Sequence, residues 1–181
     1  MAVGWVTGSP GVGKSTVCEA LKAAGQVAVD ADWEGYNHWV DRHSGKVVVD
    51  PPYPVPAGWL DRFTWRISRP AVEALVERAQ GEAVFLCGSV ENEIEVWDLF
   101  DQVICLVADS ETIRDRLQAR TTNSFGKHPE ELAAALGHNE TMEANYRSVG
   151  ATIVDGRQPP SEVAKAVLSA AAAGVPKHHR G

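Results

Sequence analysis

The stretch GSPGVGKST, residues 8–16, determines the fold that we expect for this chain of 181 residues. It matches the pattern G-x-x-x-x-G-K-[S/T], whose glycines let the backbone turn so tightly that successive N–H groups converge on phosphate oxygens. Lys14 adds a mobile cation for the β- and γ-phosphates, and Ser15 adds a hydroxyl for Mg²⁺. The residues expected to bind a nucleoside triphosphate with Mg²⁺ are Gly8, Ser9, Pro10, Gly11, Val12, Gly13, Lys14, Ser15 and Thr16.

The flanks of the loop favour this interpretation over a chance glycine-rich turn. Residues 2–7, AVGWVT, form a short apolar and β-branched run that predicts a buried strand. Residues 14–25, KSTVCEALKAAG, predict a helix that Gly25 ends. A helix that begins directly after the loop directs its positive end towards the same phosphates. The loop therefore has the strand and the helix that phosphate binding requires.

The rest of the chain continues this alternation of short apolar strands and helices, which predicts a parallel sheet with helices on both faces. The expected strands are residues 2–7, 26–30, 82–88, 102–108 and 151–156. The expected helices are residues 14–25, 69–81, 110–120, 129–150, which Gly137 could interrupt, and 161–173. We predict one three-layer α/β P-loop domain over residues 1–175, with a five-stranded parallel sheet, and a flexible tail at residues 176–181.

Composition and charge narrow the range of partners. The chain is 44% hydrophobic and 23% charged, with a net charge of −7, which argues against a general binder of nucleic acids or membrane surfaces. No stretch approaches the roughly 20 apolar residues that span a bilayer, and no basic segment precedes the first strand. Cys87 and Cys105 lie in apolar runs, which predicts buried, reduced thiols. We expect a cytoplasmic monomer or homodimer without membrane or nucleic-acid partners.

A pair of aspartates follows the second predicted strand, where open α/β sheets bind ligands. The i, i+2 spacing of Asp30 and Asp32 in an extended segment points both carboxylates to one side. One carboxylate can hold the Mg²⁺ shell while the other accepts the proton of an attacking hydroxyl. A solvated pair that caps a turn is the alternative. The chain has no N-K-x-D or T-K-x-D guanine motif, and its third strand ends in LCGS without the acidic residue of hydrolytic ATPases.

With these motifs, the sequence resembles the small kinases of the adenylate kinase-like superfamily, and among them the shikimate and gluconate kinase type. Shikimate kinases carry Asp-x-Asp after the second strand, where this chain has Asp30-Ala31-Asp32. The resemblance implies that Asp30 belongs to the magnesium shell and that Asp32 contacts the acceptor hydroxyl. Those kinases also have a glycine-rich turn after the third strand, which Cys87-Gly88-Ser89 matches with a single glycine, so Gly88 is a candidate for acceptor contact.

The same resemblance assigns residues to the nucleotide base and to a lid. It places Asp155, Gly156 and Arg157 along the base, although an ordinary strand–turn–helix connection explains that segment equally well. It places an arginine at the start of a lid over the triphosphate, and Arg120 matches it. We expect Arg120 to stack on adenine or to neutralise the transferring phosphoryl group. Residues 120–130 would form the lid, with Lys127 as a further cation; the alternative is a polar, solvated loop.

Residues 31–68 break the alternation of strands and helices and occupy the place where these kinases bind the acceptor. Prolines cluster at residues 50–56, and four of the six tryptophans of the chain are Trp33, Trp39, Trp59 and Trp65. Aromatic faces suit a base or a sugar, and arginine suits an anion. Trp33 and, by analogy with shikimate kinases, Arg66 are the candidate acceptor contacts. Packing of an irregular segment also explains the tryptophans, and helix capping explains Glu91 and Asn92 after the third strand.

Together these features predict an ATP- and Mg²⁺-dependent kinase that acts on a small molecule. Lys14, Asp32 and Arg120 are its expected catalytic residues, and Ser15 and Asp30 its expected metal ligands. A nucleoside monophosphate kinase would carry a G-[F/Y]-P-R type segment after the third strand, which the chain lacks. A nucleotide-binding ATPase or switch protein without an acceptor is the rival from another class, and it predicts ATP binding without a phosphorylated product.

Overall fold

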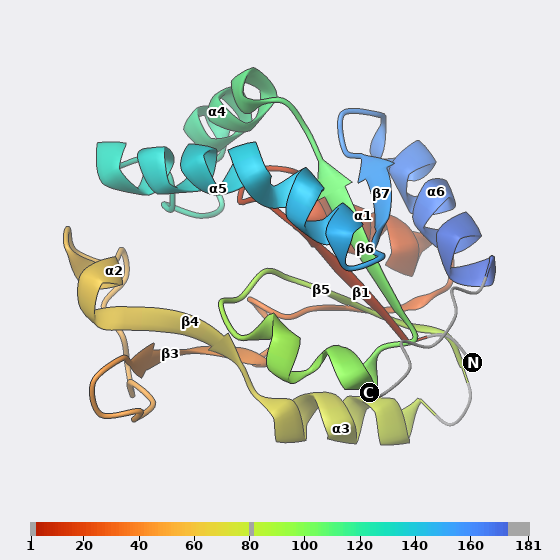
Figure 1. The fold of residues 1–181 in the computed structure, drawn as a ribbon, viewed down its shortest axis with the longest axis horizontal. Helices are drawn as coiled ribbons and strands as arrows, with labels where there is room; N and C mark the ends of the chain where they lie inside the picture. The colour runs from red at the N-terminus through yellow and green to blue at the C-terminus, as the bar shows by residue number, and fades with distance from the viewer. Residues whose placement is uncertain (1–2, 80–81, 174–181) are drawn as a thin grey trace.

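A computed structural model describes residues 3–79 and 82–173 and shows the predicted α/β architecture (Figure 1). Its centre is a five-stranded parallel sheet in the order β2-β5-β1-β6-β7. The strands are β1 (Val3–Gly8), β2 (Val27–Asp30), β5 (Val84–Cys87), β6 (Gln102–Val107) and β7 (Thr152–Asp155). Each begins within two residues of the start of a predicted strand, because continuous apolar runs mark strands that are buried on both faces.

Helices cover both faces of this sheet, as the sequence predicted. They are α1 (Lys14–Ala23), α3 (Arg69–Arg78), α4 (Ser110–Ala119), α5 (Pro129–Ser148) and α6 (Pro160–Ala172). One core packs α1, α4 and α6 against the sheet residues Val6, Phe85 and Ile104. A second core packs α3 against Trp5 and Leu86 on the opposite face, and the C-terminal half of α5 covers Cys105 on that face through Met142 and Tyr146. The sheet and its two helical layers form the three-layer fold.

The segment between β2 and α3 contains regular structure that the sequence pattern did not show. β3 (Asn37–Asp41) and β4 (Phe63–Ile67) form an antiparallel pair in which Trp39 lies opposite Trp65, and α2 (Trp59–Arg62) precedes β4. The pair extends away from the main sheet (Figure 1). Its strands have five residues each and are separated by a proline-rich stretch, so neither shows the long apolar run that marks the central strands. We call residues 31–68 the insert.

Two further segments add detail to the predicted pattern. The helix α5 runs without interruption past Gly137, where an added Cβ would meet no atom within 4 Å, so this exposed glycine costs helix stability but causes no break. Residues 91–100 form two short 3₁₀ turns, η1 (Glu93–Glu95) and η2 (Trp97–Leu99). Cys87 and Cys105 are buried and unpaired, as predicted. The predicted tail at residues 176–181 lies outside the described residues, and no helix of the described part is long and apolar enough to cross a membrane.

Candidate active site

A cleft of about 1530 Å³ lies at the carboxyl ends of the central strands. The glycine-rich loop and α1 form one side, α4 and α5 reach over it, and the insert forms the other side. One drug-sized ligand occupies a pocket of about 300–1,000 Å³. This cleft is larger, so it has room for two ligands side by side.

The loop after β1 has the geometry that phosphate binding needs. Gly8, Gly11 and Gly13 adopt φ angles of 148°, 87° and 111°, which side chains disfavour. A Cβ on Gly8 would lie 2.6 Å from the Leu106 carbonyl oxygen. Within the loop, Lys14 Nζ donates to the carbonyl oxygens of Gly8 (2.7 Å) and Ser9 (3.1 Å). Burial lowers the pKa of Lys14, and the carboxylates of Asp32 and Asp30 oppose this shift.

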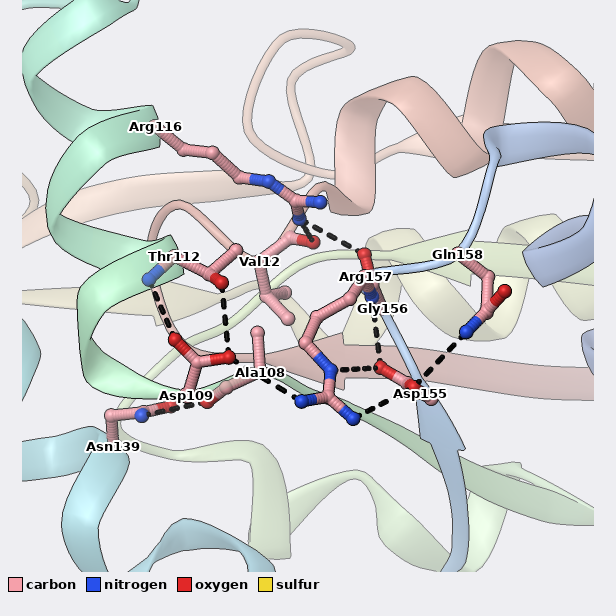
Figure 2. Close-up of polar contacts among 10 residues, drawn as sticks. All are labelled: Val12, Ala108, Asp109, Thr112, Arg116, Asn139, Asp155, Gly156, Arg157 and Gln158. Atoms are coloured by element: carbon pink, nitrogen blue, oxygen red, sulfur yellow. Dashed lines mark hydrogen bonds and ion pairs between the residues drawn. The ribbon is translucent and has the colours of Figure 1, made fainter.

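Most of the loop residues predicted to bind nucleotide line the cleft, and two of them do not. Residues 10–16 line it, whereas Gly8 and Ser9 lie beneath it. The buried Ser9 hydroxyl donates to Asn139 Oδ1 at 2.8 Å, and Asn139 Nδ2 donates to the Ala108 carbonyl oxygen at 3.0 Å (Figure 2). Ser9 therefore connects the loop to α5 and β6, a role that no local motif indicates.

Arg116 of α4 is a cleft residue that the sequence analysis did not select. Its Nη1 donates to the carbonyl oxygens of Val12 (2.7 Å) and Gly156 (2.9 Å) (Figure 2). The guanidinium thereby joins the glycine-rich loop to the segment after β7 and places a positive charge at the edge of the cleft. The spacing of Arg116 and Arg120, one helical turn apart, was the signal that could have identified it.

Asp30 and Ser15 bring a carboxylate and a hydroxyl together at the start of α1. Asp30 is 7% exposed, and burial raises its pKa, while hydrogen bonds from the Ser15 hydroxyl and from the backbone N–H of Asp32 oppose the shift. Hard oxygen donors of this kind are those that Mg²⁺ prefers. The pair fits a magnesium ion bound between the loop and β2.

Asp32 lines the same cleft and is held by the insert. Its Oδ1 accepts hydrogen bonds from Asn37 Nδ2 (2.6 Å) and Trp65 Nε1 (2.8 Å). These donors come from β3 and β4, so the small antiparallel pair fixes the orientation of the carboxylate. Sequence reasoning identified Asp32 but missed both of its supports, because they lie 5 and 33 residues away.

Glu93 is a second carboxyl group on the cleft wall that the sequence analysis missed. Its carboxyl accepts hydrogen bonds from Trp5 Nε1 (2.8 Å) and Thr7 Oγ1 (3.3 Å), and it contacts the Tyr146 hydroxyl. Burial raises the pKa of Glu93 to about 7, although these hydrogen bonds and the positive charge of Lys14 act in the opposite direction. Glu93 therefore connects β1, η1 and α5 beneath the cleft.

Several residues of the segment predicted to form a lid line the cleft. Arg120 lines the cleft, donates from Nη2 to the Phe125 carbonyl oxygen at 2.8 Å, and has a buried Nε without a partner among the described residues. Burial lowers the pKa of Arg120, and electrostatic interactions with Tyr53, Asp32 and Glu131 oppose this shift. The backbone N–H of Ser124 donates to the Tyr53 hydroxyl at 3.1 Å, so this segment contacts the insert.

Several predicted contacts lie outside the cleft lining. The guanidinium of Arg66 is paired with Glu95 at 2.6 Å. A Cβ on Gly88 would lie 2.9 Å from Ala31 Cβ, so this glycine allows close packing of the strand ends. Of the three residues assigned to the base, only Gly156 lines the cleft. Asp155 and Arg157 pair with each other at 2.8 Å in a separate hollow (Figure 2).

Lys127 also lies away from the cleft, because its ammonium group donates to the Gln118 carbonyl oxygen. Glu91 does line the cleft and is paired with Arg42. Asn92 binds the backbone of β4, since its side chain accepts from Ile67 N–H at 2.9 Å and donates to the Ile67 carbonyl oxygen at 3.2 Å. The Asn92 side chain makes no helix cap among the described residues, so the expected capping role is wrong for this residue, and Glu91 belongs to the cleft wall.

Residues 5–137 match the family model described as AAA domain. The chain belongs to this family. The match covers β1, the glycine-rich loop, the insert and α4, and thus most of the cleft that the geometry defines. No curated protein matches the chain in sequence.

Solved structures extend the comparison to the whole fold. A gluconokinase from Sinorhizobium meliloti 1021 is 23% identical over 95% of this chain and 92% of its own, with a TM-score of 0.56. A shikimate kinase from Acinetobacter baumannii, in complex with shikimate, is 16% identical over 93% and 92%, with a TM-score of 0.56. A deoxyadenosine kinase from M. mycoides with bound dATP is 14% identical over 93% and 98%, with a TM-score of 0.52. The chain has the fold of these P-loop kinases, as its resemblance to them predicted.

Proposed function

We propose that the protein is an ATP-dependent kinase that transfers the γ-phosphoryl group to a hydroxyl of a small molecule. The observation that carries this proposal is the position of Asp32. Its carboxylate faces the same cleft as the loop lysine and is oriented by two neutral donors, Asn37 and Trp65. A carboxylate held in this way is arranged to accept a proton from an acceptor hydroxyl.

The donor side has the parts that phosphoryl transfer requires. The loop N–H groups and Lys14 would hold the β- and γ-phosphates, and Arg116 and Arg120 would face the charge that develops during transfer. Ser15 and Asp30 would hold Mg²⁺, which neutralises charge on the phosphates when bound. Gly156, together with the neighbouring Gln158, would lie beside the base.

The transfer itself forms one bond and breaks one. The acceptor oxygen bonds to the γ-phosphorus, the bond from this phosphorus to the β–γ bridging oxygen breaks, and ADP leaves. Asp32 takes the hydroxyl proton, and Lys14 and Arg120 counter the charge on the moving phosphoryl group. Residues 31–68 would bind the acceptor and residues 120–130 would close over the phosphates, within one domain spanning residues 1–175.

The similar structures support this function as a proposal. Gluconokinase, shikimate kinase and deoxyadenosine kinase are three kinases of small molecules, and the last holds a nucleoside triphosphate. Their acceptors differ from one another, so their likeness to this chain favours the reaction class over any single substrate.

The proposal is tested directly by incubating the protein with labelled ATP, Mg²⁺ and a set of candidate acceptors. This set includes sugars, hydroxy acids, nucleosides and nucleotides. A labelled product is expected, and Asp32→Asn should lower its rate by about 10²–10⁴-fold, the range for loss of a general base, with ATP affinity unchanged. Asp115→Asn, on the exposed face of α4, is the matched control. ATP hydrolysis without a phosphorylated product, or full transfer by Asp32→Asn, would contradict the proposal.

A further inference from the structure

The acceptor side of the cleft has an unusual charge arrangement. The insert carries Arg42, Arg62 and Arg66, and Arg69 follows it at the start of α3. None of these four arginines lines the cleft within the described residues. The lysines and arginines that do line it are Lys14, Lys22, Arg116 and Arg120, which lie in α1, in α4 and at the C-cap of α4, on the donor side.

Each arginine near the insert is bound by a carboxylate. Arg42 makes two hydrogen bonds to Glu91, at 2.8 and 2.6 Å, and Arg66 makes two to Glu95, at 2.6 and 2.7 Å. The other two follow the same rule: Arg62 pairs with Asp41 at 2.8 Å, and Arg69 pairs with Asp98 at 2.7 Å. Arg42 and Arg69 each use two nitrogens in a two-pronged pair, whereas Arg66 uses one nitrogen and Arg62 its Nε. These pairs occupy donors that would otherwise recognise an anionic ligand.

The acceptor side also presents acidic groups to the cleft. Asp32 is held by the neutral donors Asn37 and Trp65. The cations that interact with its charge, Lys14 and Arg120, belong to the donor side of the cleft. Glu93 receives hydrogen bonds from the neutral side chains of Trp5 and Thr7. Lys14 and Arg120 are the cations assigned to the transferring phosphate, and no arginine or lysine of the insert, which the structure describes in full, lines the cleft. A carboxylate or phosphate on the acceptor would therefore approach the two acidic groups without a cation of its own, and like charges in a partly buried site repel strongly.

Aromatic rings also line the acceptor side of the cleft. Trp33, Trp39, Tyr53 and Trp65 line the cleft, and the rings of Trp39 and Trp65 pack with their centroids 4.9 Å apart. Trp33 is 59% exposed, so its face is open to the cleft. Aromatic faces bind the apolar side of a sugar or a base, and they attract amines through cation–π contacts.

We infer that the acceptor is a hydroxyl-bearing compound with a flat face and no negative charge: a neutral or amine-bearing sugar, cyclitol or nucleoside. The inference rests on the proposed kinase function and specifies its substrate class. It also separates this site from one that accepts sugar acids, hydroxy acids or nucleoside monophosphates, which would need a free arginine where this chain has paired ones.

Matched acceptors test the inference. We would compare phosphorylation of glucose, glucosamine, gluconate and glucose 6-phosphate, and of adenosine against its monophosphate, with labelled ATP and Mg²⁺. The neutral or amine member of a set should exceed the acid and the phosphate by at least about tenfold in kcat/KM, the effect of one unpaired charge. An acid or phosphate that is used equally well or better would overturn the inference.

Two variants locate the cause of the charge preference. Glu91 lines the cleft, so Glu91→Gln frees Arg42 directly beside it and should raise the use of the acid relative to its neutral partner by about tenfold. Glu95→Gln frees Arg66, which lies outside the cleft lining, and should leave that ratio unchanged. Equal responses of the two variants, or none from Glu91→Gln, would count against the inference.

Failure of the kinase proposal is distinguishable from failure of this inference. If Mg²⁺ and ATP bind but no acceptor is labelled, the proposed function fails. Binding of the same matched compounds is then measured through quenching of tryptophan fluorescence, in the presence of a non-hydrolysable ATP analogue. Weaker binding of the acidic member supports the charge preference without any transfer, and equal or tighter binding refutes it.

Discussion

The two sides of the cleft are built in different ways. The donor side is a local structure, in which nine consecutive residues supply the glycines, the lysine and the hydroxyl of the phosphate loop. The acceptor side is assembled from residues that are distant in sequence, such as Asp32 with Trp65 and Arg42 with Glu91. The phosphate loop was therefore identifiable from a motif, whereas the pairing of charged groups on the other side appears only in the folded chain.

Loss of Lys14 should give the largest effect on the donor side. Lys14→Met removes the cation that the loop holds against the Gly8 and Ser9 carbonyl oxygens, and with it the charge facing the transferring group. We expect phosphoryl transfer to fall by about 10³-fold or more, as for other removed phosphate-binding cations. Steady-state kinetics measure this, with Lys165→Met on the exposed face of α6 as the control. Transfer within tenfold of wild type would show that the local loop does not dominate the donor side.

Glu93 lies where the two sides meet, and its pKa makes the fold sensitive to pH. Its pKa rises from 4.5 in the unfolded chain to about 7 in the folded protein, so between these values the folded state binds more protons. Stability should therefore decline as pH rises from about 4.5 to 7 and stay level above that. Each pKa unit corresponds to about 1.36 kcal/mol, so the loss in the free energy of unfolding is on the order of 3 kcal/mol.

Urea unfolding of wild type and Glu93→Gln at pH 4.5 and pH 8 measures this effect. The amide cannot ionise, so the variant should lack the loss between the two pH values. The charged and titratable groups around Glu93 are Lys14, Cys105 and Tyr146, and all are retained in the variant. Parallel pH profiles for the two proteins would contradict the assigned pKa.

A substitution at Arg116 tests whether the phosphate loop keeps its shape without contacts from residues distant in sequence. Arg116→Met removes both hydrogen bonds that join Val12 to Gly156. A hydrogen bond from a charged group contributes about 1.5–3 kcal/mol, so ATP should bind about 10- to 100-fold more weakly. Arg114→Met, an exposed neighbour on α4, controls for loss of charge on the helix. Equal ATP affinity in both variants, by calorimetry, would show that the loop holds its shape alone.

Trp65 gives the smallest expected effect and the sharpest test of the acceptor side. Trp65→Phe keeps an aromatic ring but removes the hydrogen bond to Asp32. Loss of one such bond, about 1 kcal/mol, should lower kcat about fivefold, with ATP affinity unaffected. Trp59→Phe is a matched control, because the Trp59 Nε1 is buried without a hydrogen-bond partner among the described residues. A drop in kcat for both variants would assign the effect to packing of the insert.

The sequence predicted the central fold because its signals are local. Continuous apolar runs marked the five parallel strands, and the glycine pattern marked the loop between β1 and α1. It missed β3 and β4 because short, half-exposed strands beside prolines lack such a run. The aromatic and β-branched residues of NHWVD and FTWRI were the available signal.

The missed site residues share a different cause. Arg116 contacts Gly156 across 40 positions, and Glu93 contacts Tyr146 across 53. Arg66 matched the expected residue type but is neutralised by Glu95, which only the folded chain brings near it. Residue type can indicate a charge in a sequence, but the pairing of that charge is a tertiary property.

The single hydrogen bond between Tyr53 and Ser124 has a consequence for the order of events in the cleft. It spans the gap between the insert and the lid segment, so neither can move outward without breaking it. In the proposed kinase, a ligand in one half of the cleft would therefore influence the position of the other half. By thermodynamic linkage, whatever factor the acceptor adds to nucleotide affinity, the nucleotide must add to acceptor affinity. A synergistic ternary complex, with little turnover of ATP by water alone, is the behaviour expected of such an enclosure.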